Sequence, residues 1–371
     1  MTRLSDLAAR LAGLEADALK RTRRRLESPQ GVSVTIDGRD CVSFCSNDYL
    51  GLAAHPGIAR AVEEGVRRYG TGAGASHLLT GHSEVHEALE RDLARFSGFP
   101  SALLFSSGYM ANLGVVTALL GRGDAVFGDR LNHACLNDGA LLSRATFHRH
   151  PHGDLAALER QLAASEARVR MIMVDGVFSM DGDIAPLPEL LDLARRHDAW
   201  LLVDDAHGFG VLGENGMGLA EQEGLQRRIT FQMGTLSKAA GLSGGYLAAS
   251  REWIDLLTNR ARSFIYSTAP PPALAHAAIT SLELIRSDEG RQLRRRLLAH
   301  LSHFPGSTTP IVPIHLGSNE AALAAASALE DAGFLVPAIR YPTVPRGKAR
   351  LRISLSAAHS GESVRALAAA L

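Results

Sequence analysis

The sequence has 371 residues, of which 46% are hydrophobic, and its 39 basic residues balance its 39 acidic ones. A chain of this length can bury a sizeable core in two or three domains, so it needs neither disulfides nor a metal to fold. Zero net charge argues against a dedicated nucleic-acid-binding protein, because phosphate contacts require a surplus of basic residues.

Cysteines and apolar runs indicate the compartment. Three cysteines, an odd number without zinc-ligand spacing, are typical of a reducing environment. The first 25 residues include Asp6, Glu15 and Asp17, which fits neither a signal peptide nor an acid-poor transit peptide. No run of about 18 apolar residues is present for a membrane span. We therefore expect a cytoplasmic protein with no membrane partner.

The chain begins with a predicted amphipathic helix. Leucines at positions 4, 7, 11 and 14 recur at helical spacing. Four arginines between residues 21 and 25 are expected at the C-terminal end of this helix, where positive charges interact favourably with the helix dipole. We assign residues 1–48 to this helix and the segment that follows it.

From residue 100 onward, short apolar runs alternate with longer helical patterns. Runs without polar alternation are typical of strands buried on both faces, which predicts an α/β domain with a mainly parallel sheet over residues 49–278. After three prolines at 270–272 the pattern changes to long helical stretches with a few strands, such as 351–355, which predicts a smaller α+β domain over residues 279–371. The predicted strands of the large domain are 102–105, 125–128, 171–174, 200–203, 230–233 and 246–249.

Polar side chains follow five of these runs. Ligands of open α/β sheets bind at the carboxyl ends of the strands, so these side chains are expected to converge on one crevice. The run 102–105 leads through two serines and Gly108 into a helical pattern, whose free N-terminal amides can hold a phosphate. The other runs are followed by His133, by Ser179, by Asp204, Asp205 and His207, and by Thr235 and Lys238.

This set has the composition of a pyridoxal phosphate site. That cofactor requires a phosphate cradle, a lysine that binds it covalently, and a carboxylate that keeps its ring nitrogen protonated. Each residue alone has an ordinary structural explanation; Asp204, for example, could cap a helix. The combination, with one lysine in a loop of small residues, indicates pyridoxal phosphate.

Five motifs resemble those of the α-oxoamine synthases, in family order and over nearly the whole chain. They are 46–52 (SNDYLGL), 176–183 (GVFSMDGD), 204–208 (DDAHG), 235–238 (TLSK) and 351–354 (LRIS). The resemblance implies a fold-type-I pyridoxal-phosphate transferase that works as a homodimer and joins an amino acid to an acyl thioester with loss of carbon dioxide. Asp175 stands where the family commonly has glutamate, and the region 295–314 is shorter than in relatives.

The resemblance implies a role for each residue around the cofactor ring. Lys238 would hold the cofactor and move the substrate's proton, and Asp204 would pair with the ring nitrogen. His133 would stack on the ring. His207 and Ser179 would hydrogen-bond around the phenolic oxygen. Of these five residues, all except Ser179 are expected to be catalytic.

The phosphate and the substrates have their own implied residues. The amides of Gly108 and Tyr109 and the hydroxyl of Thr235 would bind the phosphate, helped by Ser267 and Thr268 of the other subunit. The implied substrate-binding residues are Arg352 and Asn47, which would hold the amino acid's carboxylate, His133, and Arg21 and Thr343, which match positions near the acyl thioester.

The resemblance also suggests substrates. Residues 204–207 and 341–345 (YPTVP) are similar to the branch of the family that serves biotin synthesis, which implies L-alanine and pimeloyl-coenzyme A or pimeloyl-acyl carrier protein. The alternative within the family is a synthase that uses glycine or serine with another acyl-coenzyme A.

Three rival interpretations are weaker. Residues 241–245 (GLSGG) match the nucleophile elbow of serine hydrolases, but a loop precedes them and a predicted strand follows. A non-catalytic partner subunit would have lost Lys238. The histidines at 148, 150 and 152 lack suitably spaced carboxylates for zinc, and we expect them to be solvated in a loop.

Overall fold

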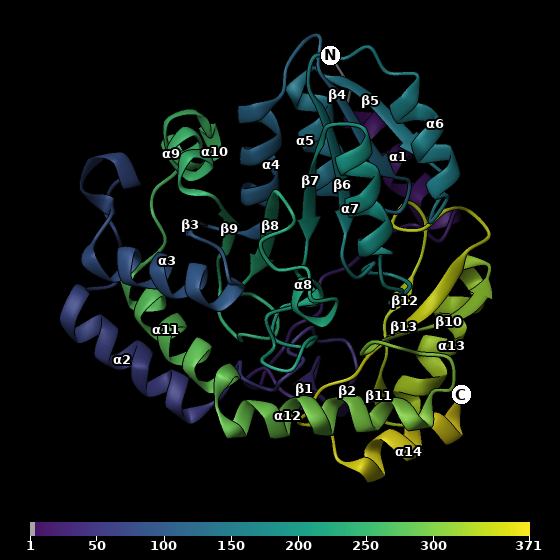
Figure 1. Cartoon of the computed structure of the whole chain (residues 1–371). Helices are drawn as coiled ribbons and strands as arrows, with labels where there is room; N and C mark the ends of the chain where they lie inside the picture. Colours follow the sequence, from purple (N-terminus) through teal and green to yellow (C-terminus); the bar gives the residue numbers. More distant parts are fainter. Residues whose placement is uncertain (1–3) are drawn as a thin grey trace. The chain divides into compact units, whose positions relative to one another are not determined.

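The computed structural model describes residues 4–371, which form two compact units (Figure 1). The small unit consists of the chain up to Asn47 together with Met180–Gly182 and Leu297–Leu371. The large unit consists of Asp48–Ser179 and Asp183–Arg296. The domain boundaries expected after residues 48 and 278 stay predictions; the units change along the chain after Asn47 and after Arg296. Helix α11 (Pro272–Arg286) packs against α2 (Pro56–Tyr69) and α3 (Glu84–Ser97), and it therefore belongs to the large unit.

A seven-stranded sheet organises the large unit, in the order β3-β9-β8-β7-β6-β4-β5. Strand β9 is antiparallel to both of its neighbours, and the remaining pairs are parallel. Every residue of β4, β8 and β9 is buried, as expected of apolar runs covered on both faces. The predicted mainly parallel α/β sheet is confirmed. The strands are β3 (Ser101–Phe105), β4 (Ala125–Asp129), β5 (Thr146–His150), β6 (Arg170–Asp175), β7 (Ala199–Asp204), β8 (Phe231–Thr235) and β9 (Gly245–Ala249).

Side-chain caps fix where three helices of the large unit begin. Ser107 accepts a hydrogen bond from Met110 N at the start of α4, and Asp154 accepts one from Ala157 N at the start of α6. His133 caps α5 in the same way. Besides α2, α3 and α11, the helical segments of the large unit are η1 (His77–Gly81, π-helical), α4 (Gly108–Leu119), α5 (Ala134–Ser143), α6 (Leu155–Ala163), α7 (Leu187–Arg196), α8 (Leu219–Gln222), α9 (Arg251–Arg260), α10 (Arg262–Ile265) and α12 (Asp288–Ala299). The last residues of α12 belong to the small unit.

The small unit has two three-stranded sheets, β1-β2-β11 and β10-β13-β12, which confirms its predicted α+β character. The second sheet is antiparallel, and its central strand β13 covers most of the predicted run 351–355. Across the described residues of both units, no helix has the length and apolar character of a membrane span. The elements of the small unit are α1 (Leu4–Ala16), β1 (Ser33–Ile36), β2 (Arg39–Ser43), η2 (His300–His303, 3-10), β10 (Ile311–Gly317), α13 (Asn319–Asp331), β11 (Phe334–Leu335), β12 (Ala338–Ile339), β13 (Ala349–Ser354) and α14 (Gly361–Ala370).

Two sequence-based expectations are wrong. Helix α1 ends at Ala16, so the arginines at 21–25 do not lie at its C-terminus; Arg24 instead forms ion pairs with Asp37 and Glu330. The histidine-rich segment is not a solvated loop, because residues 146–150 form β5 and His150 is buried. Strand β5 lies at the edge of the sheet and carries polar residues, so it lacks the continuous apolar run that identified the other strands.

Candidate active site

A cavity of about 210 Å³ lies at the carboxyl ends of the parallel strands in the large unit. The side chains that follow five predicted strands therefore meet in one place, as expected for an open α/β sheet. Ser267 and Thr268 do not line this cavity, and Thr268 instead pairs through its backbone with Ser76. Eight of the residues expected at the cofactor do line it: Gly108, Tyr109, His133, Ser179, Asp204, His207, Thr235 and Lys238.

The N-terminus of α4 forms one end of the cavity. A side chain at Gly108 would place its Cβ 3.3 Å from the sulfur of Met233 and 3.6 Å from Cβ of Thr235, so the backbone approaches β8 closely at this point. The hydroxyls of Thr235 and Ser237 lie 2.8 Å apart beside it. Free helix amides and two hydroxyls together form a suitable cradle for a phosphate.

Asp204 is held at the cavity by hydrogen bonds to both of its carboxylate oxygens. Its Oδ2 accepts from Nδ2 of Asn112 at 2.7 Å, and its Oδ1 accepts from the backbone N–H of Ala206 at 3.0 Å. The side chain of Asp204 is buried, and these bonds fix the orientation of its carboxylate at the cavity. Sequence reasoning missed Asn112, although its position four residues after Gly108 places both on one side of α4.

Lys238 and His207 are in direct contact. Nζ of Lys238 lies 3.1 Å from Nε2 of His207, and Nδ1 of His207 lies 2.7 Å from the hydroxyl of Tyr49. Tyr49 is almost completely buried. It belongs to the motif 46–52, but neither its residue type nor its spacing distinguished it from the other residues of that motif. The His207 imidazole is therefore held between the Tyr49 hydroxyl at Nδ1 and the Lys238 amine at Nε2.

His133 is held by its own neighbours at the start of α5. Its Nδ1 accepts from the N–H of Cys135 at 3.2 Å and lies 2.8 Å from the Cys135 sulfur. Burial lowers the pKa of His133; the charge of Lys238 acts in the same direction, and that of Asp204 opposes it. The ring is therefore neutral, and because Nδ1 is an acceptor its hydrogen lies on Nε2. Burial also raises the pKa of the Cys135 thiol, which stays protonated.

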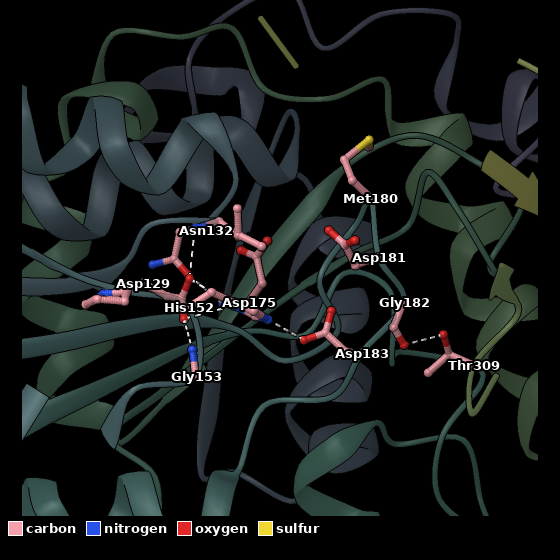
Figure 2. A network of polar contacts seen from close by, with 12 residues as sticks. Asp129, Asn132, His152, Gly153, Asp175, Met180, Asp181, Gly182, Asp183 and Thr309 are labelled. Carbon is pink, nitrogen blue, oxygen red and sulfur yellow. Dashed lines mark hydrogen bonds and ion pairs between the residues drawn. The ribbon is translucent and has the colours of Figure 1, made fainter. Parts of the chain in front are cut away.

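Asp175 accepts hydrogen bonds from the backbone of His133. Its carboxylate oxygens accept from the backbone N–H of His133 at 3.1 and 3.2 Å, and its own N–H donates to Oδ1 of Asn132 (Figure 2). Asp175 is buried, and this burial, together with the charge of Asp204, raises the pKa of Asp175 well above its usual range. The position where relatives commonly carry glutamate thus contacts the backbone of a cavity residue directly.

The small unit brings together both predicted pairs of substrate residues. Nη1 and Nη2 of Arg352 each lie 3.2 Å from Oδ1 of Asn47, and the Arg352 side chain is buried on β13. Nη2 of Arg21 donates to Oγ1 of Thr343 at 2.9 Å. Arg21 and Thr343 line a groove of about 750 Å³ in this unit.

Two rival site types find no support in the structure. Ser243 leads directly into strand β9, so the strand-to-helix turn of a nucleophile elbow does not form around it. Within residues 4–371, no group of three or more histidine, cysteine or acidic side chains is arranged to hold a metal ion.

Comparison with known proteins decides the family. The model of the aminotransferase class I and II family matches residues 39–371. The 8-amino-7-oxononanoate synthase of Aromatoleum aromaticum is 56% identical over 99% of this chain and 98% of its own length. The chain belongs to the 8-amino-7-oxononanoate synthases. A second member, from Nitrosospira multiformis, is 57% identical over 95% of this chain and 92% of its own length.

Solved structures agree with this family. The serine palmitoyltransferase of Sphingomonas wittichii has a TM-score of 0.91 at 30% identity and covers 98% of this chain and 94% of its own. The 8-amino-7-oxononanoate synthase of Francisella tularensis has a TM-score of 0.77 at 28% identity, with 89% and 96% covered. A further serine palmitoyltransferase structure, with a TM-score of 0.91, contains pyridoxal phosphate. The predicted fold-type-I architecture, the cofactor and the acyltransferase class are confirmed.

Proposed function

We propose that the enzyme joins L-alanine to a pimeloyl thioester, of coenzyme A or acyl carrier protein, and releases carbon dioxide to give 8-amino-7-oxononanoate for biotin synthesis. The observation that carries this proposal is the pairing of Lys238 with His207 in a cavity that also holds the buried Asp204. Full-length relatives more than 50% identical to this chain bear the name of that product.

The chain's own residues fit pyridoxal phosphate. The amides of Gly108 and Tyr109 and the hydroxyl of Thr235 would hold its phosphate, and Asp204 would keep a proton on its ring nitrogen. When bound, this cofactor accepts electrons from the bonds at the amino acid's Cα.

Lys238 and His133 would act on either side of that ring. The amine of Lys238 would hold the cofactor covalently between turnovers and, once released, move the proton at Cα. The neutral imidazole of His133 would stack on the ring and offer its Nε2–H to the substrate. Arg352 would hold the substrate's carboxylate, because its planar guanidinium donates two parallel hydrogen bonds.

Substrate choice is tested by a matrix of amino acids and thioesters. Glycine, L-alanine and L-serine are each combined with acetyl-, succinyl-, pimeloyl- and palmitoyl-coenzyme A while thiol release is followed. We expect the highest kcat/KM for L-alanine with the pimeloyl thioester. One methyl group changes binding by only about 1–3 kcal/mol, so glycine should retain measurable activity. Preference for glycine with the acetyl or succinyl thioester would contradict this assignment.

Replacing Arg352 by leucine is expected to weaken binding of the amino acid by about 2–4 kcal/mol, the effect of losing a buried charge pair. The guanidinium only donates hydrogen bonds and stays charged, so the effect should appear in KM more than in kcat. Titration of the holoenzyme with L-alanine measures it, and Arg352→Lys serves as the matched variant that keeps the charge. A titration indistinguishable from the wild-type one would place the carboxylate contact elsewhere.

We also propose a homodimer. Large apolar side chains are unusually exposed on the large unit, among them Leu79 (77%), Leu141 (66%), Leu142 (63%) and Tyr266 (71%). Such exposure is typical of surfaces that a second subunit covers. Ser267 and Thr268 directly follow Tyr266 and do not line the chain's own cavity, which supports their expected role at the partner's phosphate.

The dimer is tested by charge on this surface. The double substitution Leu141→Glu and Leu142→Glu should convert the dimer into a monomer in size-exclusion chromatography with light scattering. Leu371→Glu, at an exposed leucine of the small unit, is the matched control and should leave the mass unchanged. A wild-type protein that is monomeric at micromolar concentration would contradict the proposal.

We further propose a cytoplasmic location. All three cysteines are free, and burial raises the pKa of Cys45 to about 12. Thiols that form no disulfide are suited to a reducing compartment, where none is required.

A further inference from the structure

His152 lies between two carboxylates of the large unit (Figure 2). Its Nδ1 is 3.1 Å from both carboxylate oxygens of Asp129, and its Nε2 is 2.7 Å from Oδ2 of Asp183. Carboxylates only accept hydrogen bonds, so both ring nitrogens donate and the ring is an imidazolium. The hydrogen bonds to Asp129 and Asp183 raise the pKa of His152 to about 10, although burial opposes this.

Asp129 ties His152 to the segment that carries His133. It ends strand β4, and its carboxylate also accepts from Leu131 N at 2.7 Å and from Gly153 N at 2.9 Å. The chain continues from Leu131 to His133, which lines the cavity. One carboxylate therefore joins His152 and its neighbour Gly153 to the backbone that leads to His133.

Asp183 ties His152 to the turn that carries Ser179. The backbone N–H of Phe178 donates to the carbonyl of Asp183 at 3.0 Å. The ring of Phe178 packs edge-on against His152, with ring centroids 4.5 Å apart and planes at 84°. Ser179 is the next residue and lines the cavity. His152 thus contacts both the residue before Ser179 and the residue that closes the turn.

We propose that His152 is a positioning residue, which holds the loop of His133 and the turn of Ser179 at a fixed separation across the cofactor cavity. It does not itself line the cavity, so it acts through these two residues. The titratable groups around His152 are Asp129, Asp183, His150, whose Nδ1 is 4.0 Å from Asp129, and Asp175, on which the charge of Asp129 acts. The expected effect of His152 on cofactor binding rests on the function proposed above for His133 and Ser179. The contacts by which His152 connects these two segments do not depend on that function.

Asp175 limits the size of the effect. It holds the backbone of His133 independently, through bonds that do not involve His152. Loss of His152 should therefore loosen the cavity without unfolding it. Cavity residues need rigid support to keep a productive geometry, so a looser loop should weaken cofactor binding.

The test begins with hydrogen exchange in the cofactor-free protein. In His152→Gln the amide nitrogen can donate to one carboxylate, but its oxygen then faces the other, so one contact is lost. We expect the backbone amides of Leu131, Gly153 and Phe178 to exchange about ten- to a hundredfold faster, the factor expected when a hydrogen bond to a charged group is lost. His148→Gln, on strand β5 just before His152, is the matched control, because that ring stacks on Phe127 instead.

A second measurement asks whether the cavity responds. The dissociation constant of pyridoxal phosphate and the visible circular dichroism of the bound cofactor are compared in the same variants. His152→Gln should raise the dissociation constant about tenfold, equivalent to about 1.4 kcal/mol, and change the dichroism. Adding Asp183→Asn to His152→Gln should restore both, because the new asparagine amide can donate to the glutamine oxygen.

Each outcome decides one half of the inference. Wild-type exchange rates in His152→Gln would overturn the connection between the two segments. Faster exchange with unchanged affinity and dichroism would overturn the positioning role, and so would failure of the double variant to restore them. A wild-type protein that binds no pyridoxal phosphate would instead contradict the proposed function, and the exchange data would still report on the connection.

Discussion

Replacing Lys238 by alanine is expected to abolish the visible absorbance that pyridoxal phosphate acquires when it is bound covalently, and to lower kcat by about 10²–10⁴-fold, the contribution of a positioned acid–base group. The sequence contains three lysines, and Lys238 is the one that belongs to the large unit. Its Nζ lies 3.1 Å from His207 in the cavity, and the other two lysines, Lys20 and Lys348, belong to the small unit.

The matched control is Lys348→Ala, at an exposed lysine of the small unit. Absorbance spectra of both variants, and peptide mass spectrometry after borohydride reduction of the wild-type holoenzyme, provide the measurement. The label should appear only on the peptide that contains Lys238. A label on another residue, or visible absorbance retained in Lys238→Ala, would contradict its assignment.

The large sheet was predictable because its central strands are buried on both faces. Runs such as 171–174 and 246–249 have no polar residue to interrupt them, and they correspond to β6 and β9. Strand β5 was missed since an edge strand has fewer neighbours to exclude water, and it carries two histidines and an arginine. The length of α1 was overestimated because Arg24 binds Asp37 and Glu330, a contact that helical spacing does not reveal.

The site was predictable where a residue lies within a few positions after the end of a strand. His133, Ser179 and Lys238 were found in this way, since strand ends converge in any parallel sheet. Asn112 and His152 instead make contacts between distant segments. The Asn112 amide reaches Asp204, which is 92 positions away in the chain, and His152 reaches Asp183, which is 31 positions away. Neither partner is visible in local spacing, so such supporting residues require the folded structure.

Asp204→Asn is expected to leave pyridoxal phosphate bound but to lower kcat by about 10²–10³-fold, as when one preorganised electrostatic group is removed from an active site. An amide carries no charge, so it cannot hold the proton on the ring nitrogen. It also fits the surroundings of Asp204 poorly. Both oxygens of the carboxylate accept from donors, Asn112 and Ala206, and an amide would turn its own donor toward one of them.

Two measurements separate binding from chemistry in this variant. Titration of the cofactor-free protein with pyridoxal phosphate should give a dissociation constant close to the wild-type value, because the phosphate cradle at Gly108 and Thr235 is untouched. Exchange of the α-proton of L-alanine with deuterated water should slow with kcat, since this exchange requires negative charge at Cα. Asn112→Ala removes one donor to the carboxylate and keeps the charge, so its exchange rate should lie between those of wild type and Asp204→Asn. Wild-type exchange in Asp204→Asn would show that another group keeps the ring nitrogen protonated.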